Sequence, residues 1–447
     1  MDSRAVTVVG GGLAGSEAAW QIARRGIPVT LHEMRPRRLT PAHKSGDLAE
    51  LVCSNSFRSD ELENAAGLLK AEMRRLGSVI LAVADSVRVD AGSALAVGRD
   101  AFARRVTETL ASAPCIRVVR EEVEDLPTGG VRVVATGPLT SDALARSIAK
   151  FTGAESLHFY DAIAPIIEAS SLDESKVFWA SRWGKGEGKD YANCPLDEGQ
   201  YREFVAALVA GELTPLHDFE EPRYFERCLP IEEMARRGPD TPRFGPMKPV
   251  GLCDPRTGKQ PHAVVQLRRD TLAGDHLNLV GFQSRLRWPE QERVFRLIPG
   301  LERARFVRLG QVHRNTYIDA PRVILPTYQT RADRELFFAG QLAGVEGYVE
   351  STASGLLAGW NAARLTLGFE PLSLPRTTVL GALAHYVAHA SPEHFEPAKA
   401  AFGYLPAPAV RKKRERRAQY SPQSLADLEA VALAAEAEEP RSSPVGA

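Results

Sequence analysis

The sequence predicts an α/β protein in which a Rossmann-like dinucleotide-binding domain is interrupted by a smaller inserted α+β domain. Two observations carry the first part. A strand, a glycine-rich turn and a helix follow one another at the amino terminus, and a further strand and glycine-rich turn come after residue 335. The third observation is that residues 191–305 lose this βα rhythm and are interrupted by prolines and arginines.

The amino-terminal unit has every part of a dinucleotide site in the required order. Val6 to Val9 predict a short buried strand, and Gly10-Gly11-Gly12-Leu13-Ala14-Gly15 then matches G-x-G-x-x-G. We expect a helix over residues 16–25 and a second strand over 27–31, followed by Glu33 about twenty residues after the glycines.

Each part of this unit has a physical task. Gly10 permits the tight turn, Gly12 lets the backbone approach a pyrophosphate, and Gly15 lets helix and strand pack closely. The helix N-terminus offers free N–H groups and the positive end of its dipole to phosphates. Glu33 is placed to accept hydrogen bonds from a ribose diol, which favours FAD or NAD over NADP.

Two later segments are expected to return to the cofactor. An apolar strand over residues 131–134 ends at Ala135-Thr136-Gly137, a pattern typical of two-dinucleotide-fold flavoproteins. Another strand near residue 336 leads into a turn with Gly340, Gln341 and Gly347, and then into a helix over 351–365. There is no second G-x-G-x-x-G, so NAD(P)H is expected to visit a flavin transiently rather than to occupy its own domain.

The other expected elements follow from periodicity. The expected helices cover 62–76, 100–110 and 379–390, and the expected strands lie within 78–91, 115–120, 263–268 and 277–282.

The domain limits predicted from these elements interrupt the cofactor domain once. Residues 1–190 form its first part, 191–305 the inserted substrate-facing domain, and 306–435 its second part with a basic C-terminal segment. Residues 436–447 are expected to be a disordered tail.

Composition is that of an ordinary globular chain. The sequence has 56 basic and 56 acidic residues, so bulk charge neither suggests nor excludes a nucleic-acid partner. Five cysteines without a C-x-x-C pair support neither a disulfide framework nor a zinc ribbon, and no metal is expected. The first strand leaves no room for a signal peptide and no apolar run has the length of a membrane span, so the expectation is a cytoplasmic protein without membrane contact.

Two cysteines have surroundings that favour chemistry. Cys53 lies in C-S-N-S-F-R-S, after a basic loop, where Arg58 and helix N–H groups would favour the thiolate. Cys228 has Arg227 beside it. For either cysteine, an inert buried thiol is the plain alternative.

Two basic clusters are candidate RNA contacts. Arg285, Arg287 and Trp288 lie in the inserted region, and Trp288 is also a candidate for stacking on a flat ligand such as a folate. The second cluster contains Lys412, Lys413 and Arg414. A solvated helix face and ordinary packing of the tryptophan are the alternatives.

Four segments of the sequence together resemble those of a known family. The segments GGGLAGSEAAWQIA, LVCSNSFRSD, FERCLPIEEMA and FAGQLAGVEGYVES are similar to those of the folate- and FAD-dependent tRNA (uracil-5-)-methyltransferases, nearly end to end. The resemblance implies formation of 5-methyluridine at uridine 54 of the TΨC loop of tRNA. It also implies FAD as prosthetic group, 5,10-methylenetetrahydrofolate as carbon donor, NAD(P)H as reductant, and functional cysteines at Cys53 and Cys228.

Alternatives remain at this stage. The sister family that modifies the tRNA wobble uridine shares the fold, but its further C-terminal helical domain would not fit after Gly355. A small-molecule flavin oxidoreductase and a noncatalytic RNA-binding flavoprotein are the others. Cys228 is the expected nucleophile toward uracil C6 and Cys53 the base or protecting thiol, and these two roles are open to exchange.

Overall fold

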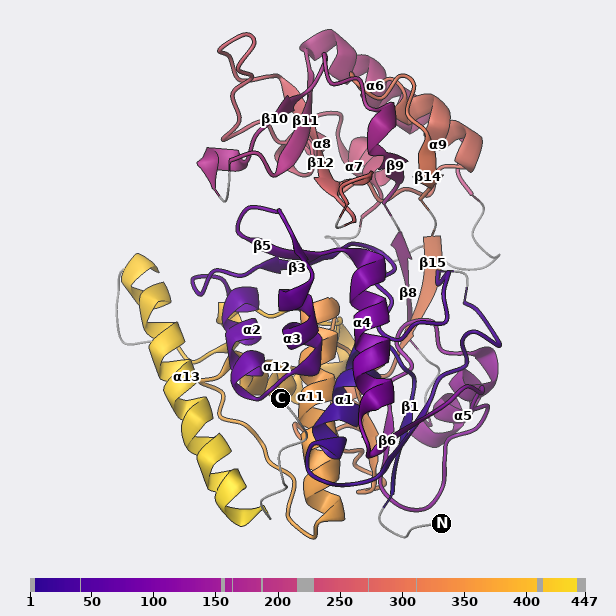
Figure 1. Cartoon of the computed structure of the whole chain (residues 1–447), viewed down its shortest axis with the longest axis vertical. Helices are drawn as coiled ribbons and strands as arrows, with labels where there is room; N and C mark the ends of the chain where they lie inside the picture. The colour runs from indigo at the N-terminus through magenta and orange to yellow at the C-terminus, as the bar shows by residue number, and fades with distance from the viewer. Residues whose placement is uncertain are drawn as a thin grey trace.

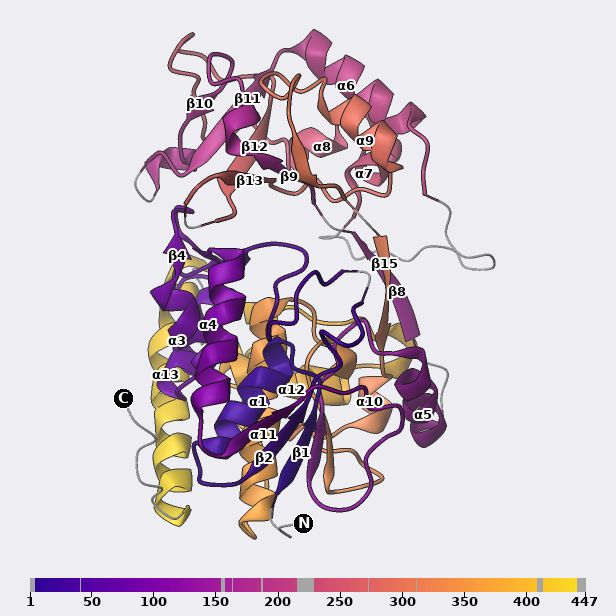
Figure 2. The ribbon, with the colours of Figure 1, turned by 45° about the vertical axis from the view of Figure 1, so that its right-hand side comes forward.

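The computed structural model describes residues 5–40, 42–153, 157–162, 164–185, 188–214, 229–271, 273–310, 312–407 and 413–439. Figures 1 and 2 show two bodies, a larger one that contains both chain ends and a smaller one built from the middle of the chain. An antiparallel pair of strands, β8 (Leu157–Ala162) and β15 (Val312–Tyr317), lies side by side between them.

The larger body is organised around a parallel sheet with the strand order β16-β7-β1-β2-β6. Its strands are β1 (Val6–Val9), β2 (Val29–His32), β6 (Ile116–Val119), β7 (Arg132–Val134) and β16 (Leu336–Phe338). From β1 the chain continues to β2 on one side, and β7 lies on the other side, so the strand order reverses at β1. Open α/β sheets bind ligands in the crevice that such a reversal leaves at the carboxyl ends of the strands.

Two helices in contact join the two glycine-rich segments. Helix α1 (Leu13–Ala23) packs along α11 (Tyr348–Thr366), and this is the most extensive helix pairing in the larger body. A Cβ on Gly355 would lie 2.2 Å from the Ala14 carbonyl oxygen, so only glycine permits this approach. The helices therefore hold the turn at Gly10–Gly15 against the turn at Gly340–Gly347.

The other elements of the larger body complete its layers. The helices are α2 (Ala65–Arg75), α3 (Val79–Ser86), α4 (Arg99–Ser112), α5 (Asp142–Thr152), α10 (Ala320–Val323), α12 (Val379–His389) and α13 (Lys413–Glu438). A small antiparallel sheet has the order β3-β5-β4, with β3 (Ser56–Ser59), β4 (Arg88–Val89) and β5 (Ala94–Val97).

The expectation of strands across residues 78–91 is wrong for most of that segment, because Val79–Ser86 form helix α3. The Ser78 side chain accepts a hydrogen bond from the Leu81 backbone N–H at 3.3 Å, which caps the helix. The run VILAVA is apolar without a break, so its periodicity does not separate a buried helix from a buried strand.

The smaller body has an antiparallel sheet with the order β10-β11-β12-β13-β9-β14 and a separate hydrophobic core from Ile167 to Ala304. Its strands are β9 (Ile166–Glu168), β10 (Phe178–Trp179), β11 (Tyr191–Leu196), β12 (Ala263–Arg269), β13 (His276–Leu279) and β14 (Phe306–Arg308). Its helices are α6 (Glu198–Ala210), α7 (Ile231–Arg237), α8 (Thr241–Phe244) and α9 (Trp288–Phe295). Strands β9 and β10 precede residue 191, and the domain limits at 190 and 305 remain a prediction.

The C-terminal end of the described chain differs from the expectation of disorder after residue 435. Helix α13 continues to Glu438, and the Glu439 carboxylate accepts hydrogen bonds from Arg25, Trp360 and Arg364 at 2.9–3.1 Å. These contacts anchor the helix end to α1 and α11, which composition alone does not reveal. Residues 440–447 lie outside the described chain. No helix in the described ranges has the length and apolarity to cross a membrane.

Candidate active site

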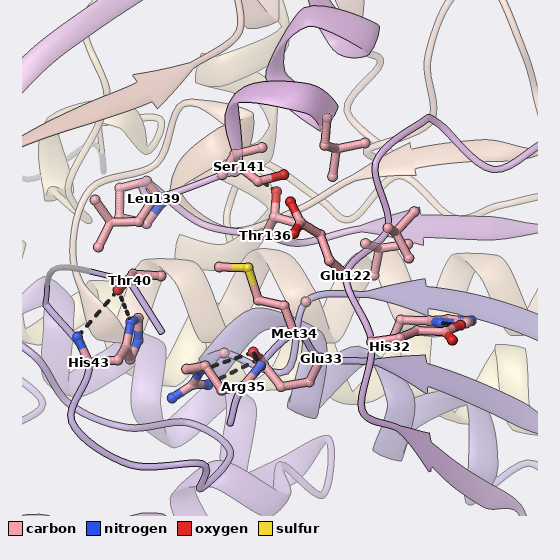
Figure 3. Close-up of a pocket in the computed structure, with 18 residues that line it drawn as sticks. His32, Glu33, Met34, Arg35, Thr40, His43, Glu122, Thr136, Leu139 and Ser141 are labelled. Carbon is pink, nitrogen blue, oxygen red and sulfur yellow. Dashed lines mark hydrogen bonds and ion pairs between the residues drawn. The ribbon is translucent and has the colours of Figure 1, made fainter. Parts of the chain in front are cut away.

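A first cavity opens where the carboxyl ends of β1, β2 and β7 meet the start of α1 (Figure 3). Its lining includes Gly10, Gly12, Glu33 and Thr136. Gly10 has a φ of +99°, and a Cβ on Gly12 would meet no atom within 4 Å. The chain therefore leaves open space beside Gly12, at the N-terminus of α1, where free N–H groups can receive a diphosphate.

The turn itself is held by contacts that exclude larger side chains. A Cβ on Gly15 would lie 1.7 Å from the Gly10 carbonyl oxygen. The Gly11 backbone N–H donates to Glu33 Oε2 at 2.9 Å, so the acid at the end of β2 also fixes the turn. This hydrogen bond couples the glycine motif to Glu33, 22 positions further along the chain.

Glu33 also binds Arg35, a buried residue that the sequence did not single out. The Arg35 Nε and Nη2 atoms donate to Glu33 Oε1 and Oε2, each at 3.0 Å. Burial opposes ionisation of Glu33, but the hydrogen bonds and charge of Arg35 outweigh it and hold the pKa of Glu33 below its ordinary value. Glu33 is therefore a carboxylate, the form that accepts hydrogen bonds from a ribose diol.

The far wall of the first cavity comes from the turn after β7. The hydroxyls of Thr136 and Thr140 lie 2.7 Å apart, and Gly137 takes a φ of +69°. Opposite them, His43 is next to Thr40 (Figure 3), and burial together with the charge of Arg35 lowers the pKa of His43 to about 4. His43 is thus neutral near pH 7, and it faces the cavity as a hydrogen-bonding group rather than as a cation.

A second cavity of about 310 Å³ lies between the two bodies. It is lined by the loop at Cys53, by Gln341 and Gly347 of the second glycine-rich segment, and by residues of the smaller sheet that include Arg268 and Asn278. The first glycine-rich segment thus lines the first cavity and the second segment lines the second cavity, and the packing of α1 on α11 holds the two segments together. Such a volume is in the range of small-molecule sites.

The loop at Cys53 is held from the larger body by Tyr348. The backbone N–H groups of Cys53 and Ser54 donate to the Tyr348 hydroxyl oxygen at 2.7 and 3.0 Å. Burial raises the pKa of Tyr348, so the phenol stays neutral and its own O–H remains a donor. Tyr348 therefore fixes the backbone amides on both sides of the Cys53 α-carbon without carrying charge.

Two buried arginines hold the same loop against the smaller body. Arg99 donates to the Leu51 carbonyl oxygen at 2.6 Å and forms an ion pair with Asp270 at 2.8 Å. Arg268 donates to Asn55 Oδ1 at 2.9 Å and also to the neighbouring serine hydroxyl. Cys53 interacts electrostatically with Arg99, and positive charge of this kind favours a thiolate.

The remaining predicted residues are not brought to these cavities. Trp288 is 54% exposed at the start of α9, and Arg287 forms an exposed ion pair with Glu212. Arg285 is mostly buried near Glu233, and none of the three predicted residues lines the second cavity.

The other predicted residues belong to segments that the structure describes only in part. Cys228 and Lys412 lie outside the described residues, while Lys413 and Arg414 belong to the first turn of α13. Among the described residues, no group of three or more His, Cys, Asp or Glu side chains could hold a metal ion.

Sequence reasoning missed most of the polar lining. Tyr348 follows the second glycine-rich turn directly, and its position after Gly347 is a signal that could have found it. Asn278 is a polar residue between two leucines in the strand HLNL, which is a similar signal. Arg99 and Asp270 are separated by 171 positions and carry no local signature.

The fold and the first cavity define the class of protein as a dinucleotide-binding α/β protein. Residues 5–370 match the model of the family described as glucose inhibited division protein A. The structure of Aquifex aeolicus GidA has a TM-score of 0.71 at 19% identity, covering 98% of this chain and 76% of that one, which shows a shared fold. The predicted α/β dinucleotide-binding fold is confirmed.

Curated relatives are far more similar. The methylenetetrahydrofolate--tRNA-(uracil-5-)-methyltransferase TrmFO of Geobacter sulfurreducens is 58% identical over 426 residues, 95% of this chain and 98% of the relative. The protein of the same name from Enterococcus faecalis is 55% identical, over 93% of this chain and 95% of the relative. The chain therefore belongs to the methylenetetrahydrofolate--tRNA-(uracil-5-)-methyltransferase family, and the resemblance noted in its sequence is confirmed.

Proposed function

We propose that this protein methylates C5 of uracil in tRNA, at uridine 54, with methylenetetrahydrofolate as carbon donor and FAD, reduced by NAD(P)H, as reductant. The observation that carries the proposal is the 55–58% identity, over nearly the whole chain, to relatives named for this reaction. The structure supports it with a dinucleotide cavity and a cysteine-lined cavity built from adjoining segments.

FAD fits the residues present. The open space beside Gly12 at the α1 N-terminus suits its diphosphate, and the Glu33 carboxylate suits its ribose. Gln341 and Gly347 are the residues proposed to hold its flavin end, because they line the second cavity and come just before α11, which packs along α1. When bound, FAD supplies the hydride that converts the transferred one-carbon unit to methyl.

The chemistry of uracil explains the need for thiols. C5 is a poor nucleophile until a thiolate adds to C6, after which C5 can attack the methylene carbon of the folate. A base must then remove the C5 proton, so that tetrahydrofolate leaves as its C–N bond to the methylene breaks. A hydride must add to the exocyclic methylene that remains, and the thiol must leave as the C6–S bond breaks. We assign the nucleophile to Cys228 and the base or protecting role to Cys53.

The described residues around Cys53 fit either of these two thiol roles. Tyr348 fixes the backbone N–H of Cys53, and Arg99 supplies a positive charge that favours the thiolate. Arg268 ties the following residues of the loop to the smaller sheet, so the loop cannot shift independently of that sheet. The target uracil must leave the stack of its RNA loop to reach this cavity, as in other enzymes that act on a base.

The covalent step gives the test. With tRNA that carries 5-fluorouridine, which cannot lose its C5 substituent as a proton, the protein is expected to form an adduct that survives denaturation. Cys53→Ala is expected to retain adduct formation and Cys228→Ala to abolish it, because only the nucleophile bonds to C6. The measurement is the fraction of protein with retarded mobility in a denaturing gel.

Two outcomes would count against the assignment. Adduct in Cys228→Ala but not in Cys53→Ala would exchange the two roles. No adduct in the unsubstituted protein would argue against addition to uracil altogether. Cys115→Ala is the matched control, because Cys115 lies beside β6 and lines neither cavity.

A further inference from the structure

The sheet of the smaller body turns one polar face away from its own core. Along β12 and β13, alternate residues are buried in the hydrophobic core, namely Val265, Leu267, Leu277 and Leu279. The residues between them point the other way, since successive side chains in a strand face opposite sides. They include Gln266, Arg268 and Asn278, and Arg268 and Asn278 pair directly across the two strands.

Two of these three polar residues have partners within the protein. Gln266 Nε2 donates to Asn193 Oδ1 at 2.9 Å, and Asn193 in turn donates to three backbone carbonyl oxygens at 3.0–3.1 Å. Arg268 donates to Asn55 and to the adjacent serine. This face therefore follows the usual rule that buried polar groups are hydrogen-bonded.

Asn278 departs from that rule. Its side chain is 2% exposed, and Nδ2 has no hydrogen-bond partner among the described residues. A buried donor left without an acceptor is destabilising. Asn278 also lines the second cavity together with Cys53 and Tyr348. A buried amide donor without a partner, at the wall of this cavity, is thus placed to bind a ligand.

We propose that Asn278 binds the lactam edge of a planar heterocycle, the adjacent ring N–H and C=O groups that uracil, pterin and flavin share. A carboxamide matches this edge with two hydrogen bonds, because its N–H donates to the ring carbonyl and its oxygen accepts from the ring N–H. The same pairing logic underlies the bidentate recognition of base edges by asparagine. The inference rests on the proposed function, which brings all three heterocycles to this cavity.

The test compares Asn278→Ala, Asn278→Asp and the unsubstituted protein in three measurements. These are the FAD bound per chain from the visible absorbance, the affinity for tetrahydrofolate from protein fluorescence, and the KM for tRNA separately from kcat. Asn278→Ala is expected to weaken binding of one heterocycle by about tenfold, in keeping with the loss of one to two hydrogen bonds. Asn278→Asp is expected to weaken it further, because a carboxylate repels the ring carbonyl.

The affected measurement identifies the ligand as flavin, pterin or uracil. Asn193→Ala is the matched control, because its carboxamide lies on the same sheet but bonds only within the protein. It is expected to lower the melting temperature and leave the three ligand measurements within about twofold. Asn278→Ala with all three ligands bound as tightly as by the unsubstituted protein would overturn the inference.

Failure of the proposed function is separable from failure of this inference. Unsubstituted protein that methylates no RNA would refute the function, while FAD content and tetrahydrofolate affinity would still test Asn278. Unsubstituted protein that methylates RNA, beside an Asn278→Ala variant with unchanged KM, FAD content and folate affinity, would refute only the role of Asn278.

Discussion

Gly15→Ala is expected to yield protein without bound FAD and with a free energy of unfolding lowered by about 3 kcal/mol. The added Cβ would lie 1.7 Å from the Gly10 carbonyl oxygen, so the turn and helix α1 must move apart. That movement displaces the N–H groups at the start of α1, which are the proposed diphosphate contacts. Visible absorbance of the purified protein and urea unfolding measure the two effects.

Gly12→Ala is the matched control, because its Cβ would meet no protein atom within 4 Å. The flavin-free protein with this substitution is expected to unfold at nearly the same urea concentration as the flavin-free unsubstituted protein. FAD binding is nevertheless expected to be lost, since the methyl group occupies the space proposed for the diphosphate. Stoichiometric FAD in Gly15→Ala would contradict this account of the cofactor site.

The second large effect is expected at the ion pair between the two bodies. Asp270→Asn should lower the free energy of unfolding by about 3–5 kcal/mol, because it leaves the buried Arg99 guanidinium without its counter-charge. The Arg99 and Asp270 side chains are only 8% and 5% exposed. Since Arg99 also holds the Leu51 carbonyl, methylation activity should fall as the Cys53 loop loosens.

A surface ion pair between the same bodies provides the control. Arg269 and Asp90 lie 2.9 Å apart with side chains 32% and 49% exposed, so Asp90→Asn should cost less than about 1 kcal/mol. The double substitution Arg99→Met with Asp270→Leu should recover most of the stability, since neither charge is then buried alone. Equal effects of Asp270→Asn and Asp90→Asn in urea unfolding would contradict the role given to the buried pair.

The elements that the sequence predicts well are those with local signatures. The strand β1, the glycine turn, α1 and Glu33 follow one another within 30 residues, and Glu33 contacts the glycine turn directly. Helix α3 was missed because an unbroken apolar run has no period, even though Ser78 offered an N-cap.

The second cavity depends on contacts that no local pattern carries. Cys53 meets Tyr348 across 295 positions, and Arg99 meets Asp270 across 171. The composition of residues 285–288 predicts a ligand contact, yet Arg285, Arg287 and Trp288 do not line the second cavity. Asn278 is distinguished from its neighbours on the sheet face only by hydrogen bonding, because Gln266 and Arg268 have partners and Asn278 Nδ2 has none among the described residues.

One measurement tests the central claim most directly. The purified protein is incubated with unmodified tRNA, NADH and methylenetetrahydrofolate labelled in its methylene carbon, and the RNA is digested to nucleosides. The expected result is label in 5-methyluridine, and none from a transcript with cytidine in place of uridine 54. Consumption of NADH without label in the RNA, or label in a wobble-position nucleoside, would contradict the proposed function.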